Sequence, residues 1–228
     1  MIWTKRRLLI AVAMSDTLTS KQFYELFIRL EEDMALNESF VLGDLKYSLP
    51  EETNKWIESM DWDLEIKRLQ VQKIKVLTIL DGAYPQRLKE IYLPPIVLFY
   101  RGNLSLINQR AVAIVGSRDH SKYAKDCIHE LIPTIINDGI VVVSGLARGV
   151  DTLAHEETLK TSGNTIAVIG SGLDVVYPPE NANLYDMIAK RGLLLSEYPL
   201  ESRPLKFHFP YRNRIIAGLS HGVCVIEA

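Results

Sequence analysis

The stretch AVAIVGSR (residues 111–118) decides the fold of this 228-residue chain. Five apolar residues follow one another without interruption and end in Gly116, Ser117 and Arg118. A continuous apolar run of this length is typical of a strand that is buried on both faces of a parallel sheet. A helical pattern follows at residues 123–137, where isoleucines and leucines recur at helical spacing.

The same unit recurs further along the chain. Four more strand patterns are IVVVSGLARG (140–149), TIAVIGSGLD (165–174), GLLLSEYP (192–199) and HGVCVIEA (221–228). Helices are predicted between them at about 151–161 and 183–190. Strands that alternate with helices predict an α/β fold, here a Rossmann-like domain with a mainly parallel sheet. Two further strands are predicted upstream, at residues 75–80 and 96–100.

The first third of the chain predicts helices instead. Apolar residues fall on one face of a helix at Phe23, Leu26, Phe27, Leu30 and Met34. Capping boxes are predicted for the pairs Thr19–Gln22 and Ser48–Glu51. The apolar run at residues 8–14 is too short for a membrane span and lacks a signal-cleavage site, so it predicts a buried helix. We therefore expect a small all-α domain at residues 1–74 and the Rossmann-like domain at residues 75–228.

Composition excludes some functions. The formal net charge of −2 argues against a protein that holds nucleic acid by its overall charge, although a local basic patch stays possible. Cys127 and Cys224 have no CxxC or metal-binding spacing, which favours reduced thiols in the cytoplasm. The five histidines show no metal-ligand spacing either, so no metal site is predicted.

Small residues stand where three strands end, in VGSR, SGLARG and GSGLD. In open parallel sheets ligands bind at this edge, where small residues let backbone amides approach an anion closely. Arg118 and Arg148 would add charge-assisted hydrogen bonds to a phosphate. The alternative is that these glycines only make tight turns. Neither G-x-G-x-x-G nor a P-loop is present, and no catalytic constellation is evident.

The segment ESRPLKFHFPYRNR (201–214) concentrates positive charge: Arg203, Lys206, Arg212 and Arg214 stand against Glu201 alone. Basic residues interleaved with aromatic ones suit single-stranded nucleic acid. In the alternative interpretation, the aromatic residues are the core of an extended connection and the arginines pair with carboxylates such as Asp174 or Glu197. Two positions separate Arg212 from Arg214, so they cannot share one helix face, and at least one of them is structural.

Four motifs in this order, VGSR, SGLARGVD, GSGLDVVYPPEN and FPYRNRIIAGLS, resemble the DNA processing protein A (DprA/Smf) family. The specific resemblance covers residues 75–228. The first third resembles the family's SAM-like or helix-hairpin-helix domain more loosely. The resemblance implies a cytoplasmic, non-catalytic protein without a cofactor. Such a protein binds single-stranded DNA, protects incoming DNA and helps to load RecA during natural transformation.

The resemblance also implies a site for DNA phosphates. Its residues are Gly116, Ser117, Arg118, Ser144, Gly145, Arg148, Gly149, Gly170, Gly172, Asn181, Lys206, Arg212, Asn213 and Arg214. The chain departs from the family where it stops at CVIEA, so we expect a C-terminally truncated piece. A homodimer interface and the surface that contacts RecA would then be partly missing. In YPPENAN the only charge is Glu180, and the lack of the basic residue that some family members have in this loop could weaken DNA binding or move it to Lys122 or Lys206.

Two other functions stay open at this point. One is a nucleotide-binding enzyme similar to the lysine-decarboxylase-like phosphoribohydrolases, with Asp174 or Glu197 as its catalytic carboxylate, although the P-G-G-x-G-T segment is lacking. The other is an interaction module in which the helical third binds a protein partner.

Overall fold

The computed structural model describes residues 2–33, 39–44 and 49–227. Its centre is a seven-stranded sheet in the order β3-β4-β8-β7-β6-β5-β9. The strands are β3 (Lys75–Thr78), β4 (Val97–Gly102), β5 (Ala111–Val115), β6 (Val141–Ser144), β7 (Thr165–Ile169), β8 (Leu193–Ser196) and β9 (Val223–Val225). From β8 to β9 neighbouring strands are parallel, whereas β3–β4 and β4–β8 are antiparallel. The predicted mainly parallel α/β fold is confirmed.

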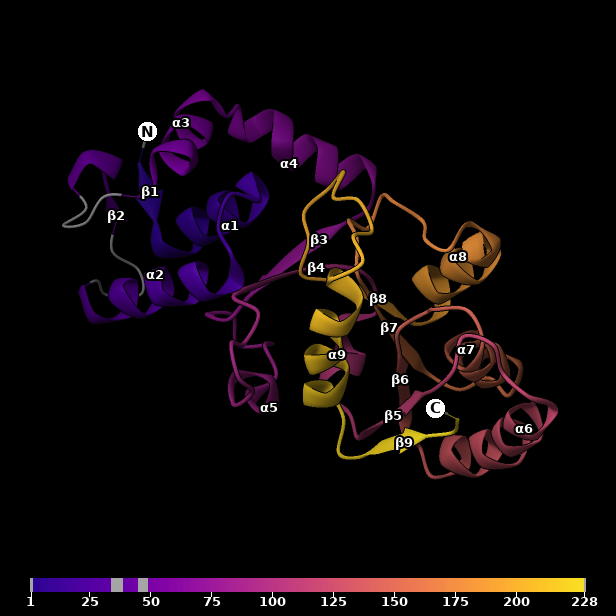
Figure 1. Cartoon of the computed structure of the whole chain (residues 1–228). Coiled ribbons are helices and arrows are strands. Elements are labelled where there is room, and N and C mark those ends of the chain that lie inside the picture. The colour runs from indigo at the N-terminus through magenta and orange to yellow at the C-terminus, as the bar shows by residue number, and fades with distance from the viewer. Residues whose placement is uncertain (1, 34–38, 45–48, 228) are drawn as a thin grey trace.

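Helices cover both faces of this sheet (Figure 1). One face carries α6 (Lys122–Asn137), α7 (Val150–Lys160) and α8 (Ala182–Arg191). The other carries α9 (His208–Leu219), with the short α5 (Gln86–Lys89) packed beside it. Two 3-10 turns, at Leu104–Asn108 and Pro179–Asn181, complete this part of the chain. Both sheet faces are thus covered, which explains why the strands are continuous apolar runs.

The first third of the chain is helical, as predicted, with α1 (Lys5–Ser15), α2 (Ser20–Asp33), α3 (Glu51–Ser59) and α4 (Trp62–Val71). The Thr19–Gln22 capping box is confirmed: the Thr19 backbone N–H donates to Gln22 Oε1 at 3.0 Å, and the Gln22 N–H donates to Thr19 Oγ1 at 3.4 Å. Met34 and Ser48 lie outside the described residues. A 3-10 turn at Leu42–Asp44 and two short antiparallel strands, β1 (Trp3–Thr4) and β2 (Ser39–Phe40), were not expected, because two residues are too few to show alternation.

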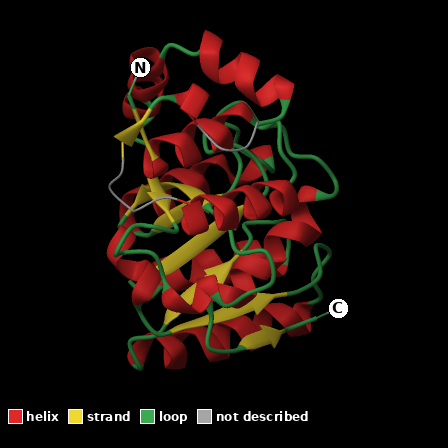
Figure 2. Cartoon of the chain, turned by 90° about the vertical axis from the view of Figure 1, so that its left-hand side faces the viewer, coloured by secondary structure: helices red, strands yellow, loops and turns green. Residues whose placement is uncertain are grey.

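One hydrophobic core extends through the helical third and the sheet. Leu8 and Leu30 of the N-terminal helices belong to the same buried cluster as Leu98 of β4 and Val143 of β6. The N-terminal end lies at one end of the molecule and the C-terminal end at the other (Figure 2). Within the described part of the chain, every helix is too short or too polar to cross a bilayer.

The order of the strands in the sheet indicates where a ligand would bind. From β5 the chain adds β6, β7 and β8 on one side, whereas β9 returns to the opposite side of β5. The strand order therefore switches direction at β5. The carboxyl ends of β5, β6 and β7 carry VGSR, SGLARG and GSGLD, so the three small-residue loops meet at one edge, where doubly wound sheets bind ligands.

A buried histidine makes the stability of the fold depend on pH. His155 of α7 donates from Nδ1 to Thr165 Oγ1 of β7 at 2.7 Å, while the Thr165 hydroxyl donates to the Val142 carbonyl. Burial, together with the positive charge of Arg212, lowers the pKa of His155 to about 3. The folded chain therefore keeps this ring neutral where the unfolded chain binds a proton, below about pH 6.5.

We predict that the free energy of unfolding falls as the pH falls through about 6.5, because protons then stabilise only the unfolded chain. For this one group the loss between pH 7 and pH 5 is about 2 kcal/mol. Urea unfolding of the native chain and of a His155→Gln variant at both pH values measures it. The difference in free energy of unfolding between the native chain and the variant should be about 2 kcal/mol less favourable to the native chain at pH 5 than at pH 7. A difference that stays constant with pH would contradict the assignment.

Candidate nucleic-acid interface

The three strand-end loops enclose a cavity of about 170 Å³. Backbone and small side chains form much of its wall, and two arginines stand at its edge. The lining residues are Arg118, Asp119, Gly145, Leu146, Ala147, Arg148, Ile169, Gly170, Ser171, Tyr177, Pro178 and Phe209. Four of the predicted phosphate-binding residues, Arg118, Gly145, Arg148 and Gly170, are therefore brought together here.

Arg118 supplies the available positive charge of this cavity. Its side chain is exposed and forms no hydrogen bond or ion pair with any described residue. The guanidinium carbon lies 5.5 Å from the centre of the Phe209 ring, and Phe209 packs on Tyr177 with 5.4 Å between ring centres. A cation above an aromatic face keeps its outer N–H groups free, so Arg118 can donate to an anion that enters the cavity.

Arg148 is exposed on the opposite loop and pairs with Glu180. Both side chains are largely in water, where an ion pair contributes little, so a phosphate can compete with Glu180 for the guanidinium. The acidic residue of the YPPEN loop is thus placed beside a cation.

Arg212 is buried and does not line the cavity. Its guanidinium donates from Nη1 to the Gly145 carbonyl at 2.6 Å and also to the Val168 carbonyl. Its Nη2 lies 3.7 Å from Asp151 Oδ2. Burial lowers the pKa of Arg212 to about 10, a fall that Asp151 opposes, so the group is still charged at neutral pH. Direct phosphate binding by Arg212, which the sequence predicted, is corrected: this arginine fastens the loop after β6 to strand β7.

Asp151 completes this arrangement from the first turn of α7. Its Oδ2 accepts from the backbone N–H groups of Gly145 at 3.1 Å and Ala147 at 3.4 Å. The Val150 N–H donates to the Ser117 carbonyl at 3.1 Å. The first turn of α7 is therefore bonded to the loops after β5 and β6 within the chain.

Two glycines are required by close approach. A Cβ on Gly145 would overlap the Arg212 guanidinium. Gly149 has a φ of +78° and a Cβ there would overlap the carbonyls of Ser117 and Arg118. Both glycines of SGLARG therefore shape the loop, and only Gly145 also lines the cavity.

Arg214 is also turned inward. Its Nη2 donates to both carboxylate oxygens of Glu197 at 2.6 Å, and its guanidinium lies 4.2 Å from the centre of the Tyr211 ring. The predicted phosphate contact by Arg214 is corrected in the same way, whereas the alternative pairing with Glu197 is what the structure contains. Neither arginine of the RNR sequence faces the cavity.

The remaining predicted residues do not line the cavity. Ser144 Oγ donates to the Ile114 carbonyl at 2.6 Å, and Asn181 Nδ2 donates to the Leu146 carbonyl at 3.1 Å, so both buried side chains brace loops. The others outside the lining are Gly116, Ser117, Gly149, Gly172, Lys206 and Asn213. Direct phosphate contacts by Ser144 and Asn181 are corrected because their polar groups are already bonded.

Residues 208–219 form a helix, so the extended connection considered for the aromatic residues was wrong. Pro210 stands in the first turn of α9, where a missing N–H leaves no bond unmade. This helix places Phe209 in the cavity, and the sequence had not assigned that role to it. Ser171 and Asp119 were also missed, although each directly follows a residue that had been predicted. Among the described residues no group of three His, Cys, Asp or Glu side chains could hold a metal ion.

Comparison with known proteins identifies the family of this chain. The profile of the DNA recombination-mediator protein A family matches residues 75–228. The chain belongs to this family. It is 52% identical over 159 residues to DNA processing protein DprA of Streptococcus pneumoniae, which covers 70% of this chain and 56% of that protein. It is 46% identical over 157 residues to the DprA of Bacillus subtilis, covering 68% and 53%. The chain thus spans about half the length of the curated relatives that it matches.

Solved structures agree with this family assignment, which the four motifs predicted. The X-ray structure of DprA from Streptococcus pneumoniae matches with a TM-score of 0.81 and 42% identity, over 95% of this chain and 76% of that one. DprA from Helicobacter pylori, whose structure is described by its single-stranded DNA binding mode, matches with a TM-score of 0.59 and 34% identity, over 67% and 68%.

We predict that Arg212→Met destabilises the chain by about 3 kcal/mol, because it leaves the Asp151 carboxylate buried without its cation and two carbonyls without donors. Lys206→Met removes an exposed cation six residues before Arg212 and should change stability by less than about 0.5 kcal/mol. Urea unfolding measures both. Equal midpoints for the two variants would contradict the structural role of Arg212.

Proposed function

We propose that this chain binds single-stranded DNA at the strand-end cavity and acts as a DNA recombination mediator. The observation that carries the proposal is the free guanidinium of Arg118 above Phe209, at an edge of the sheet lined by backbone and small residues. Family membership supports it, as does the single-stranded DNA named for the Helicobacter pylori relative. No catalytic group is needed for this function.

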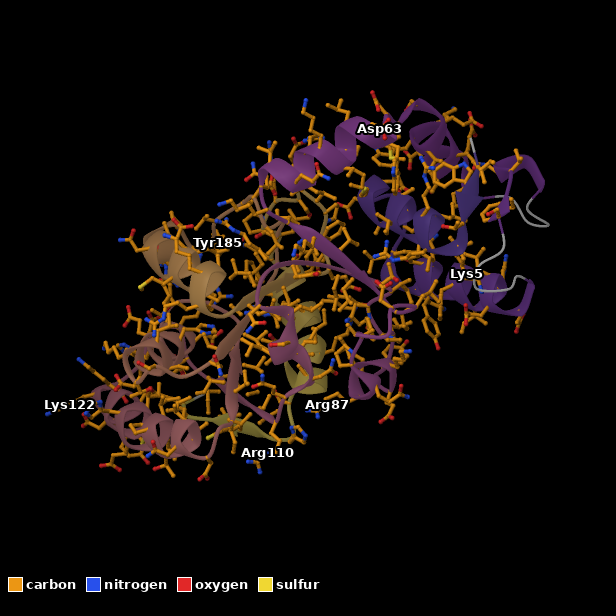
Figure 3. The ribbon with its side chains drawn as sticks, turned by 180° about the vertical axis from the view of Figure 1, so that it is seen from behind. Lys5, Asp63, Arg87, Arg110, Lys122 and Tyr185 are labelled. Atoms are coloured by element: carbon orange, nitrogen blue, oxygen red, sulfur yellow. The ribbon has the colours of Figure 1, made fainter. Side chains whose placement is uncertain are left out.

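We infer that the bound DNA strand continues from Arg118 toward two further cations. Arg203 and Lys206 are exposed and form no hydrogen bond or ion pair with a described residue, and Phe207, which follows Lys206 in the chain, has 65% of its surface exposed. Cations that track phosphates beside an exposed ring are the usual elements of a single-strand surface. Lys122 opens α6 only four residues after Arg118 and lies at the end of the molecule away from the N-terminal helices (Figure 3). Of the two lysines considered we favour Lys206, because Arg203 and the exposed Phe207 stand near it in the chain.

The wider role belongs to the same proposal. We infer protection of incoming DNA and RecA loading in the cytoplasm, with a homodimer as the assembly. These parts rest on family membership alone, because the chain spans about half of its curated relatives.

The phosphoribohydrolase alternative is not favoured. Its two candidate carboxylates are occupied: Asp174 accepts from the Glu201 backbone N–H at 2.9 Å, and Glu197 holds Arg214. Neither lines the cavity at the strand ends. The family match also leads away from that class of enzyme.

We predict that Arg118→Ala weakens binding to oligo-dT about tenfold, because a charge-assisted hydrogen bond to phosphate is lost. The slope of log affinity against log salt should become shallower by about 0.7, the value for one phosphate contact on a single strand. Fluorescence anisotropy at several salt concentrations measures both quantities.

Arg110→Ala is the matched control. It removes the same charge directly before β5, at the amino edge of the sheet, opposite the edge that holds the cavity (Figure 3). Its side chain donates to the Asp138 carbonyl at 2.9 Å. Equal effects of the two substitutions would mean that general charge, and not the strand-end cavity, binds the DNA.

A further inference from the structure

A second, larger cavity of about 800 Å³ lies between the N-terminal helices and the segment that enters α9. Its walls come from the end of α1, the start of α2, the start of β4 and residues 197–211. In Figure 1, α9 stands between α1 and α2 on one side and the parallel strands on the other. The volume is within the range of cavities that hold small organic groups.

The two cavities share the first turn of α9. Phe209 lines the cavity at the strand ends, whereas Phe207 and His208 line the larger one. His208 Nδ1 donates to the Gly170 carbonyl at 3.0 Å, and Gly170 lies in the wall of the smaller cavity. A polymer with one phosphate at Arg118 is therefore only one helical turn away from the larger cavity.

The walls of the larger cavity suit a planar, uncharged group. Leu18, Phe23, Tyr198 and Tyr211 contribute apolar and aromatic surface. The Tyr198 ring is stacked on His208, with 3.8 Å between ring centres and 19° between planes, so aromatic packing is already the dominant interaction at this wall. The hydroxyl groups of Ser20 and Ser202 can bond to polar edges, whereas those of Thr17 and Thr19 are already bonded within the chain.

The charged side chains of the larger cavity are either paired or exposed at its rim. Three carboxylates line the wall: Glu197 is paired with Arg214 and Glu201 with Arg68, whereas the exposed Asp16 has no ion pair with a described residue and would repel a phosphate. Arg203 lines the cavity, is exposed and has no hydrogen bond or ion pair with a described residue, so it can bind an anion from outside. Lys21 also lines the cavity, but it is exposed, at 4.0 Å from Glu25, and so adds a cation at the rim and not in the interior. Phosphates are thus attracted to the rim, and a neutral ring fits inside.

We propose that this cavity takes a nucleobase of the bound single strand, while the phosphates on either side lie along Arg203 and toward Arg118. The inference rests on the proposed function and adds to it a base-binding site built partly by α1 and α2. It gives the N-terminal helices a direct part in DNA binding. A short apolar peptide from a protein partner is the competing occupant.

The test compares two oligomers of equal length and charge, oligo-dT and an abasic strand of deoxyribose phosphates, by fluorescence anisotropy with the full chain. The native chain should prefer oligo-dT at least about fivefold, the lower end of what one stacked base contributes. Leu18→Trp, which fills the cavity from the α1–α2 connection, should reduce that preference to near unity and leave affinity for the abasic strand unchanged. Leu205→Trp fills it from the opposite wall and serves if the first variant does not fold.

Ile28→Trp is the control, because Ile28 is an exposed residue of α2 outside the cavity, and it should keep the preference for oligo-dT. Equal binding of both oligomers to the native chain would overturn the base site and leave the proposed function standing. A preference that survives both cavity-filling variants would also overturn it, because the bases would then bind elsewhere on the chain. Failure of oligo-dT to bind at all would instead refute the proposed function, and the base site with it.

Discussion

Two backbone carbonyls from neighbouring strand ends, those of Gly145 and Val168, accept hydrogen bonds from one buried guanidinium, that of Arg212. The same guanidinium lies 3.7 Å from Asp151, whose carboxylate holds two amides of the loop after β6. A charged group in the interior is tolerated only when its bonds are made, so this set of contacts permits little displacement of the loops. The strand-end cavity keeps its shape because of it, and Arg118 can stay free.

The two arginines of RNR therefore have a structural role, whereas the arginine of GSR is free to bind a ligand. Arg212 and Arg214 fix α9 against the sheet through backbone carbonyls and Glu197, while Arg118 stands exposed over Phe209. A basic and aromatic segment that seems a binding surface in the sequence is mostly a support for one. Its exposed members, Arg203, Lys206 and Phe207, lie before the helix and not in it.

Much of the fold could be predicted because its strands are unbroken apolar runs, such as residues 111–115 and 165–169, which occur only where both faces are covered. The helix at 208–219 was missed because Pro210 and three alternating aromatics obscure its start. The orientation of Arg212 was readable in principle: Arg212, Ile215, Ile216 and Leu219 recur at i, i+3, i+4 and i+7 and are all buried. The two carbonyls that accept from this guanidinium belong to Gly145 and Val168, which are far from Arg212 in the sequence. No local sequence pattern could therefore predict these hydrogen bonds.

The central claim is that a single strand contacts the carboxyl edge of β5, β6 and β7 through Arg118. Backbone amide chemical shifts of the ¹⁵N-labelled chain, followed while oligo-dT is titrated in, test it most directly. The account predicts that the largest shifts fall on Arg118, on residues 145–148 and on residues 170–171, with smaller ones around Arg203 to Phe207. Shifts that cluster instead on α6 or at the amino ends of these strands, with the strand-end loops unmoved, would contradict it.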